Sequence, residues 1–286
     1  MWPLSFFLPP SQDPLPVIIT LSGSNGGLGE NRAQLLASHG FAVLALGYFG
    51  APGLPNKLEN IDLAFFEKAL NWLKQRSDVQ GDRVGIYGIS RGAELALLLG
   101  SLFSDRIQAI VATVPSAVIF GGGLGNRPSH AWIYEGKPVG ITAPIPKIEL
   151  SHGQGLVPED PIVTTPDFLK SMHDYPDAYQ AAEIPVENIE AALMLISGGD
   201  DQMWPSSIFA GKVMQRLDEK GSAIERVHLS YPLAGHQISL PFLPSESVYY
   251  HPHGKLWFAM GGTPEQDDLA SRDSWVKIIH FFHAHL

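Results

Sequence analysis

Residues 88–92 read Gly-Ile-Ser-Arg-Gly, a pattern in which Ser90 can serve as a nucleophile. The apolar residues of 83–87 predict a strand that runs into this pattern, and the spacing of 91–102 predicts a helix that leaves it. A serine on such a sharp turn presents its hydroxyl above the sheet, and glycines two residues away on each side prevent clashes. We expect Ser90 to attack a carbonyl carbon while the backbone N–H of Arg91 stabilises the oxyanion. The alternative is a tight turn with a capping serine.

An orienting carboxylate is expected after a later strand, because elbow enzymes place serine, acid and histidine in that chain order. The apolar run 192–197 predicts this strand, and Asp200 and Asp201 follow it. Side chains just beyond the carboxyl end of a parallel strand lie at the ligand-binding edge of the sheet. Pro205 starts the next helix and leaves Asp201 on the exposed turn, so we expect Asp201 to orient the base and Asp200 to brace the loop. The alternative is a pair of solvated loop carboxylates.

The general base is expected among eleven histidines, of which His236 has the most suitable position. It follows a strand predicted at 224–230 through a short loop that contains glycine, and enough residues separate it from Asp201 for one helix and one strand. The other histidines considered lie within a strand, on the last predicted helix or in an irregular segment, and they are His228, His280, His283, His285, His130, His152 and His173.

No metal or cofactor is expected. The chain has no cysteine, which excludes disulfides, thiolate metal sites and a cysteine nucleophile. His251 and His253 have the spacing of metal ligands, but no further residue with ligand spacing accompanies them.

A second oxyanion donor is expected from the glycine-rich loop 22–29, which follows the apolar strand predicted at 17–21. Glycines in this loop allow its backbone to approach a substrate oxygen. The N–H of Ser24 is our first choice for this donor, and that of Asn25 is the second. The alternative is a glycine-rich turn that only joins a strand to a helix.

Strands and helices alternate along most of the chain. Predicted strands cover 17–21, 41–46, 83–87, 107–113, 192–197 and 224–230, and predicted helices cover 30–39, 60–76, 91–102, 206–220 and 271–285. This pattern predicts an α/β fold with a mostly parallel, doubly wound sheet, and the elbow makes it an α/β-hydrolase fold. Residues 119–189 interrupt the pattern with glycines, prolines and scattered aromatics. We expect them to form a cap within a single domain that spans 1–286.

Composition limits the partners of the protein. The formal net charge is −10, which argues against binding to a nucleic-acid backbone. The apolar start of the chain, Met-Trp-Pro-Leu-Ser-Phe-Phe-Leu-Pro-Pro, lacks a basic region and is interrupted by two prolines, so it predicts an edge strand or hairpin arm and not a signal peptide. No apolar run reaches the roughly 20 residues that span a bilayer. We expect a soluble, cytoplasmic protein.

Five segments resemble the C-terminal catalytic domain of the acyl-CoA thioesterase / bile acid-CoA:amino acid N-acyltransferase family. They read SGSNGGLGENRAQLLASHGFAVLAL, GIYGISRGAELAL, ISGGDDQMWPSS, AGHQISLPFLP and GGTPEQDDLASRDSWVKIIHFF, in that order along nearly the whole chain. The resemblance implies a triad on Ser90, Asp201 and His236 and an acyl-CoA thioester substrate. Members that transfer amino acids use cysteine at the elbow, so serine here favours water as the acyl acceptor.

Two other functions remain open at this point. Mammalian members of the family carry an N-terminal β-sandwich domain that this sequence lacks, so a carboxylesterase or dienelactone-hydrolase-like enzyme acting on oxygen esters is the nearest rival. A catalytically silent hydrolase fold used for binding is the other, and an intact set of serine, acid and histidine argues against it.

Coenzyme A would need basic groups near the site, because its phosphates are bound by arginine, lysine or exposed backbone N–H groups. The candidates are Arg91, Arg127, Lys137 and Lys147, with Asn25 as a further substrate contact. For each charged residue the alternative is a solvated surface charge, and for Arg91 it is an ion pair with Glu94 on the same helix.

Overall fold

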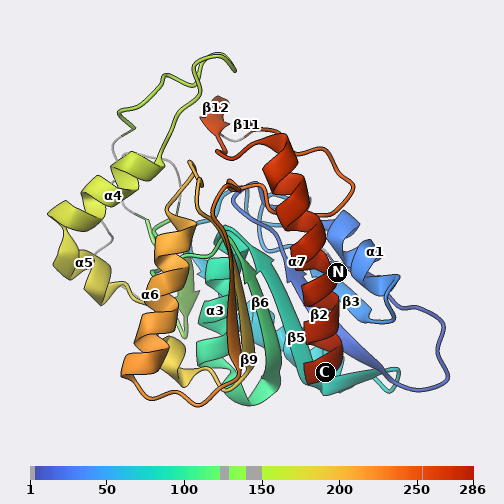
Figure 1. Ribbon diagram of the computed structural model, residues 1–286. Coiled ribbons are helices and arrows are strands. Elements are labelled where there is room, and N and C mark those ends of the chain that lie inside the picture. The colour runs from blue at the N-terminus through green and yellow to red at the C-terminus, as the bar shows by residue number, and fades with distance from the viewer. Residues whose placement is uncertain (1–3, 123–128, 140–149, 253) are drawn as a thin grey trace.

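A central seven-stranded sheet organises the computed structural model, which describes residues 4–122, 129–139, 150–252 and 254–286 (Figure 1). The spatial order is β1-β3-β2-β5-β6-β9-β10, with β1 antiparallel to β3 and the other neighbours parallel. This confirms the mostly parallel, doubly wound sheet expected from the sequence. The strands are β1 (Leu4–Phe7), β2 (Leu15–Leu21), β3 (Ala42–Leu46), β5 (Val79–Ile89), β6 (Ile107–Thr113), β9 (Ala192–Gly198) and β10 (Arg226–Tyr231).

Helices cover both faces of this sheet. One layer is α2 (Ala64–Lys74), α3 (Arg91–Leu102) and α6 (Ser206–Glu219), and the other is α1 (Glu30–Ala37) and α7 (Pro264–His285). In Figure 1, α7 lies along the near face of the sheet, beside α1. Among the described residues, no helix is long and apolar enough to cross a bilayer.

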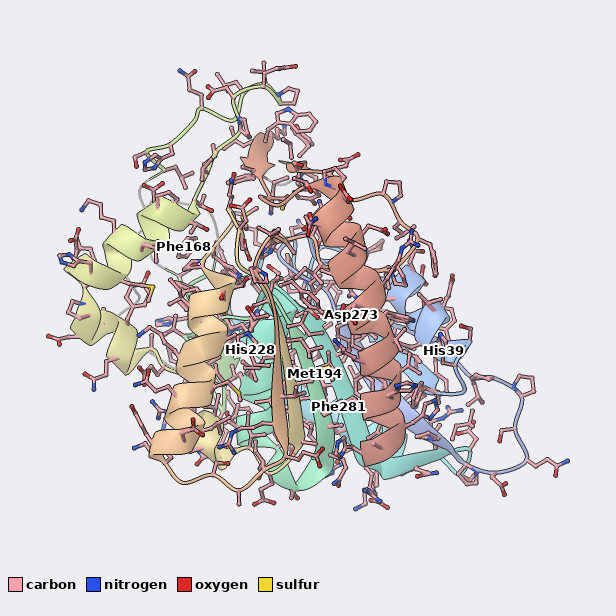
Figure 2. All side chains as sticks on the ribbon, viewed as in Figure 1. His39, Phe168, Met194, His228, Asp273 and Phe281 are labelled. Carbon is pink, nitrogen blue, oxygen red and sulfur yellow. The ribbon has the colours of Figure 1, made fainter. Side chains whose placement is uncertain are left out.

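The apolar strands are continuous in sequence because both of their faces are covered. In β2, Val17 and Ile19 pack against the first helix layer, whereas Ile18 between them packs against the second. Met194 of β9 and Phe281 of α7 lie in the second core, between the sheet and α7 (Figure 2). A strand buried on both faces needs apolar residues at successive positions, and this requirement explains why periodicity located these strands well.

Two small sheets and several short helices lie outside the central sheet. A three-stranded sheet contains β4 (Ile61–Asp62), β7 (Trp132–Tyr134) and β8 (Lys137–Pro138), and an antiparallel hairpin contains β11 (Val248–His251) and β12 (Leu256–Ala259). Short helices are η1 (Ser104–Arg106), α4 (Thr165–Asp174), α5 (Pro176–Ala181) and η2 (Val186–Asn188). The described parts of 119–189 therefore hold β7, β8, α4, α5 and η2.

Two helix starts differ from the sequence expectation. The helix expected from residue 60 begins at Ala64, because Ile61 pairs with Trp132 in a parallel bridge of β4 and β7. The last helix begins at Pro264, seven residues before the expected start. Thr263 caps it by accepting the N–H of Gln266, and proline at the first helical position suits the helix geometry.

Candidate active site

Ser90 lies on the sharp turn between β5 and α3. Its backbone angles are φ 54° and ψ −121°, which are strained for a residue with a side chain. A Cβ at Gly88 would lie 2.0 Å from the carbonyl oxygen of Gly92, and one at Gly92 would lie 2.5 Å from the carbonyl oxygen of Leu21. Only glycine fits at either position, because the backbone touches across the turn at Gly88 and against the end of β2 at Gly92.

A series of hydrogen bonds connects the three residues that the sequence singled out. His236 Nε2 lies 3.0 Å from Ser90 Oγ, and His236 Nδ1 lies 2.9 Å from Asp201 Oδ2. His236 and Asp201 are buried, whereas Ser90 is partly exposed. With Nδ1 protonated toward the carboxylate, Nε2 can accept the serine proton, which is the arrangement required for nucleophilic attack by the hydroxyl.

The two neighbouring aspartates make different contacts. Asp201 Oδ1 accepts the N–H groups of Met203 at 3.0 Å and Trp204 at 3.2 Å, so both carboxylate oxygens are occupied. The carboxylate of Asp200 contacts a different segment, since its Oδ2 accepts the N–H of Gly262 at 2.9 Å and braces the loop. The geometry thus separates the residue that contacts His236 from the one that supports the turn.

Trp204 supports the imidazole, although the sequence did not suggest this role. Its indole ring meets the His236 ring nearly edge-on, with centroids 5.8 Å apart, and its Nε1 donates to the carbonyl of Val114 at 3.1 Å. The ring of Phe120 stacks on the indole ring of Trp204, with the two ring centroids 5.9 Å apart. Trp204 directly follows residues 199–203, which we call the acid loop, and this position was the only signal of its role in the sequence.

The loop after β2 lies directly against the nucleophile. A Cβ at Gly23 would lie 3.3 Å from Ser90 Cβ, so this glycine is the point of closest approach, and sequence reasoning missed it. Ser24 and Asn25 form the exposed turn that follows, closed by a hydrogen bond from the N–H of Gly26 to the carbonyl of Gly23. The side chain of Asn25 hydrogen-bonds to that of Tyr249 on β11.

Tyr48 fixes the start of the loop after β2 through a hydrogen bond to Ser22. Its hydroxyl donates to the carbonyl of Ser22 in a fully buried environment. Burial raises the pKa of Tyr48, so the phenol remains a donor at any physiological pH.

The side chain of Arg91 is buried behind the elbow. It pairs with Glu94 at 2.8 Å and donates to the carbonyls of Phe120 at 3.1 Å and Gly121 at 3.3 Å. Glu94 also accepts the indole N–H of Trp132 at 3.0 Å, and burial raises its pKa. The alternative interpretation of Arg91, an ion pair within its helix, describes its side chain, which therefore does not point toward solvent as a phosphate contact would.

The other basic candidates are less close to the nucleophile or cannot be placed. Lys137 is exposed on β8 and pairs in register with Tyr134, whose ring contacts Phe103 at the end of α3 opposite Ser90. Twelve helical residues span about 18 Å, so Tyr134 is well removed from the elbow. Arg127 and Lys147 lie outside the described residues.

The remaining histidines lie elsewhere. His228 lies on the sheet between α6 and α7 (Figure 2), where its Nε2 is 2.8 Å from Ser197 Oγ and burial lowers its pKa. His152 lies 3.3 Å from Asp167 near the start of α4. His253 is outside the described residues, and within the described ranges no group of three metal-ligating side chains occurs.

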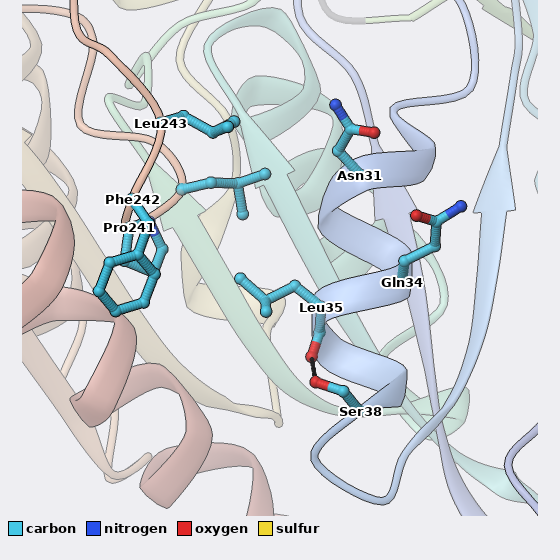
Figure 3. A pocket seen from close by; sticks show the side chains of 8 residues that line it. Asn31, Gln34, Leu35, Ser38, Pro241, Phe242 and Leu243 are labelled. Atoms are coloured by element: carbon cyan, nitrogen blue, oxygen red, sulfur yellow. Dashed lines mark hydrogen bonds between the residues drawn. The ribbon is translucent and has the colours of Figure 1, made fainter.

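A surface hollow of about 430 Å³ lies between α1 and the loop 240–243 (Figure 3). Leu35 and Gln34 line one side of it, and Pro241, Phe242 and Leu243 line the other. Ser90, Asp201 and His236 are not among its lining residues, so this hollow is separate from the hydrogen-bonded series.

The central sheet and its helices match solved α/β-hydrolases. A putative dienelactone hydrolase from Klebsiella pneumoniae superposes with a TM-score of 0.53 at 15% identity, covering 96% of this chain and 89% of that one. An acylaminoacyl peptidase from Pyrococcus horikoshii gives 0.53 at 14% identity, covering 97% and 39%. At these identities the likeness shows the fold alone, and the fold is the α/β-hydrolase fold expected from the sequence.

Sequence comparison identifies closer relatives. Human acyl-coenzyme A thioesterase 1 is 34% identical over 99% of this chain, and human acyl-coenzyme A thioesterase 2, mitochondrial, is 35% identical over 99%. The chain spans 63% and 55% of the lengths of these two relatives. Residues 61–286 match the family model described as BAAT / Acyl-CoA thioester hydrolase C terminal. The segments around Ser90, Asp201 and His236 resembled this family from the sequence alone, and the comparisons agree: the chain belongs to the BAAT / acyl-CoA thioester hydrolase family.

Proposed function

We propose that this chain, as a single α/β-hydrolase domain, cleaves acyl-CoA thioesters to a free acid and CoA through an acyl-enzyme on Ser90. The observation that carries the proposal is the series Ser90 Oγ, His236 Nε2, His236 Nδ1 and Asp201 Oδ2, with contacts of 3.0 and 2.9 Å. Membership of the BAAT / acyl-CoA thioester hydrolase family supports the choice of substrate.

In the first step, Ser90 Oγ attacks the thioester carbonyl carbon while His236 Nε2 takes the hydroxyl proton. Asp201 holds the Nδ1 proton of the ring and stabilises the imidazolium that forms. Because Asp201 Oδ1 is already held by two backbone N–H groups, the carboxylate cannot rotate freely away from the ring. Collapse of the tetrahedral intermediate breaks the C–S bond, and His236 returns the proton to the leaving thiolate.

The oxyanion of this intermediate requires donors that are in place before the reaction. The N–H of Arg91 is the first donor, since the first residues of a helix have no acceptor within it. The N–H of Ser24 is the second, and the close contact of Gly23 with Ser90 supports this choice. Tyr48, by binding the carbonyl of Ser22, holds the loop at this distance.

Water completes the second step. It attacks the acyl carbon of the Ser90 ester, His236 takes one of its protons and then returns that proton to Ser90 Oγ, and the acid leaves. No metal or bound cofactor takes part in this scheme, in which the imidazole transfers every proton.

Residues 119–189 are proposed to form a cap that shapes acyl specificity. Thr165 at the start of α4 donates to the carbonyl of Asp201 at 2.7 Å, and Phe168 contacts both Phe120 and Trp204. The described part of this segment thus packs on the loop that carries the acid. Bulk added at such positions changes the space available to an acyl chain.

The CoA portion would contact basic groups at the entrance. Because the side chain of Arg91 is paired with Glu94 and Lys137 lies beside Tyr134 near the far end of α3, Arg127 remains the proposed charged contact, with Asn25 as a polar contact on the loop after β2. These contacts predict that salt weakens the binding of acyl-CoA, since screening acts on charges.

A substrate panel tests this function. Thiol release from acyl-CoAs of increasing chain length is followed beside hydrolysis of neutral p-nitrophenyl esters, with Ser90→Ala as the blank. We expect acyl-CoA hydrolysis whose KM rises with ionic strength and with Arg127→Gln, while the esters show neither effect. Ester hydrolysis without thiol release from any acyl-CoA would favour a carboxylesterase, and failure of a fluorophosphonate to label Ser90 would favour a binding protein.

A further inference from the structure

Three separate chain segments meet behind His236. The N–H of His236 donates to the carbonyl of Met260 at 2.8 Å, and the N–H of Asp200 donates to the carbonyl of Ala234 at 3.0 Å. Asp200 in turn accepts the N–H of Gly262 through its carboxylate. The position of the imidazole therefore depends on how the loop 232–236 lies against the acid loop and against residues 260–262.

Glycines allow this close contact but leave no side chains to hold it. A Cβ at Gly235 would lie 2.3 Å from the carbonyl oxygen of Gly261, and a Cβ at Gly261 would lie 1.7 Å from that of Asp200. The three backbones touch directly at these points. Beside the packing of Ala234 in the second core, hydrogen bonds therefore contribute to holding the loop at Gly235, which has no side chain to pack.

Asp267 provides one such contact from the first turn of α7. Its side chain is completely buried, and its Oδ1 accepts the N–H of Gly235, the residue before His236, at 2.7 Å. Its Oδ2 is also buried and has no hydrogen-bond partner in the part of the chain that the structure describes. A buried carboxylate with a single hydrogen bond destabilises a fold, so a role beyond packing would account for its presence.

The charges around Asp267 belong to the candidate site. Burial raises the pKa of Asp267, the N–H of Gly235 opposes this effect, and the carboxylates of Asp201 and Asp200 raise it further. His236 is the nearby group that lowers it. The carboxylate of Asp267 therefore shares its surroundings with Asp201, Asp200 and His236, and it is connected to the histidine loop through the N–H of Gly235.

We propose that Asp267 is a positioning residue for the reaction proposed above, because its Oδ1 holds the peptide before His236 through the N–H of Gly235. The inference rests on the proposed function, because it assigns His236 the role of base. Asp267 does not touch the substrate in this scheme, and it acts through the loop that carries His236.

Three variants test whether the hydrogen bond from Gly235 to residue 267 is what matters. Asp267→Asn keeps an oxygen that can accept the N–H of Gly235 but removes the charge, whereas Asp267→Leu removes both. Asp268→Asn is the matched control, because it neutralises the neighbouring carboxylate, which is paired with Arg272 on the outer side of the same helix. The rate at which a fluorophosphonate labels Ser90 and kcat/KM for an acyl-CoA are measured between about pH 5 and 9, a range that brackets the ordinary histidine pKa.

We expect Asp267→Asn to keep the rate on the plateau within about threefold of the wild type, because its amide oxygen can still accept the N–H of Gly235. Asp267→Leu should reduce the rate on the plateau by about tenfold or more with KM unchanged, since the loop loses its contact. Asp268→Asn should match the wild type in both measurements.

Each result decides one question. A plateau rate of Asp267→Leu equal to that of the wild type, or an equal loss in Asp267→Asn and Asp267→Leu, would overturn the inference and leave the proposed function standing. A wild-type protein that neither reacts with the fluorophosphonate nor releases thiol would overturn the proposed function and the inference together. If Asp267→Leu does not fold, Asp267→Ala, which also removes the acceptor, takes its place in the same comparison.

Discussion

The elbow that carries Ser90 and the loop that carries His236 are held in different ways. Ser90 is held mainly by its own neighbours in sequence, since β5 and α3 flank it directly and Gly88 meets the carbonyl of Gly92 across the turn, while the end of β2 packs on Gly92. His236 is held by contacts with Met260, more than twenty residues later, and by the neighbouring Gly235 contact to Asp267. The first arrangement is local and the second is assembled from distant parts of the chain.

This difference explains how a substitution should act in each region. A change at the elbow disturbs the turn itself, whereas a change near the histidine acts through hydrogen bonds between segments. The acid loop is intermediate, because Asp201 is fixed by the local N–H groups of Met203 and Trp204 but is also contacted by Thr165.

The largest effect is expected at the local site. Ser90→Ala removes the atom that bonds to the acyl group, so kcat should fall by about 10⁴- to 10⁶-fold, as in comparable triads. The fold should persist, because alanine keeps the Cβ of the partly exposed Ser90 and lacks only its hydroxyl oxygen. Steady-state hydrolysis and circular dichroism are the measurements. Activity within tenfold of the wild type would show that Ser90 is not the nucleophile.

The two aspartates should differ strongly. Asp201→Asn should lower kcat by about 10⁴-fold, because an amide at this position selects the wrong histidine tautomer. Asp200→Asn should cost far less, since its contact is with the N–H of Gly262 and an amide oxygen can still accept it. Parallel kinetics of the two variants give the ranking. The reverse order would mean that Asp200 orients the base.

Gly92→Ala tests the contact between the elbow and the end of β2. The added Cβ would lie 2.5 Å from the carbonyl oxygens of both Leu21 and Ser22, so the backbone must shift. We expect kcat/KM to fall about 10²-fold, the scale of a 1 Å misplacement, and the free energy of unfolding to fall by about 1–3 kcal/mol. Gly211→Ala on α6 is the control, because its Cβ would meet no atom within 4 Å. Equal losses in both variants would contradict the geometric explanation.

The smallest effect is expected at a surface contact between η2 and α6, away from both loops. Arg216 donates to Glu187 at 2.6 and 2.7 Å, and these hydrogen bonds lower the pKa of Glu187. A lowered carboxyl pKa stabilises the fold above the ordinary value of 4.5, and this stabilisation is lost as the pH falls through the lowered pKa. Glu187→Gln should therefore reduce the free energy of unfolding by less than about 1 kcal/mol at neutral pH and by nothing in strong acid.

Urea denaturation at several pH values measures this difference, with the exposed residue Glu190, changed to Gln, as the control. Activity of Glu187→Gln should stay within about twofold of the wild type, an effect below 0.5 kcal/mol. A large loss of activity would mean that the region of η2 is coupled to the acid loop, and the contrast between local and assembled parts would need to be redrawn.

Much of the fold could be predicted because its strands are buried on both faces. The segments 17–21, 107–113 and 192–197 were expected as strands and are strands, with ends within one residue of the expected ones apart from the start of β2. The hairpin of β11 and β12 was not expected, because each strand has only four residues, which is too short for a periodic pattern, although β12 is apolar throughout. The early start of α7 was also missed, although Thr263 and Pro264 are helix-start signals.

The candidate site was predictable to the extent that residue type and chain order define it. Ser90, Asp201 and His236 were selected from the order of strands and loops, and the structure brings them within hydrogen-bonding distance. Gly23 and Trp204 were not selected, because nothing in a sequence shows that a glycine touches a serine 67 residues later or that an indole meets an imidazole.

The sequence by itself determined the elements that depend on near neighbours: the buried strands, the strand–turn–helix around Ser90 and the chain order of the three site residues. Only the tertiary structure decided that the side chain of Arg91 turns inward to Glu94, that Trp204 meets the ring of His236, and that Asp267 reaches the N–H of Gly235. The physical reason is that periodicity and turn sterics act over a few residues. A hydrogen bond between segments depends instead on how whole elements pack, which no short stretch of sequence specifies.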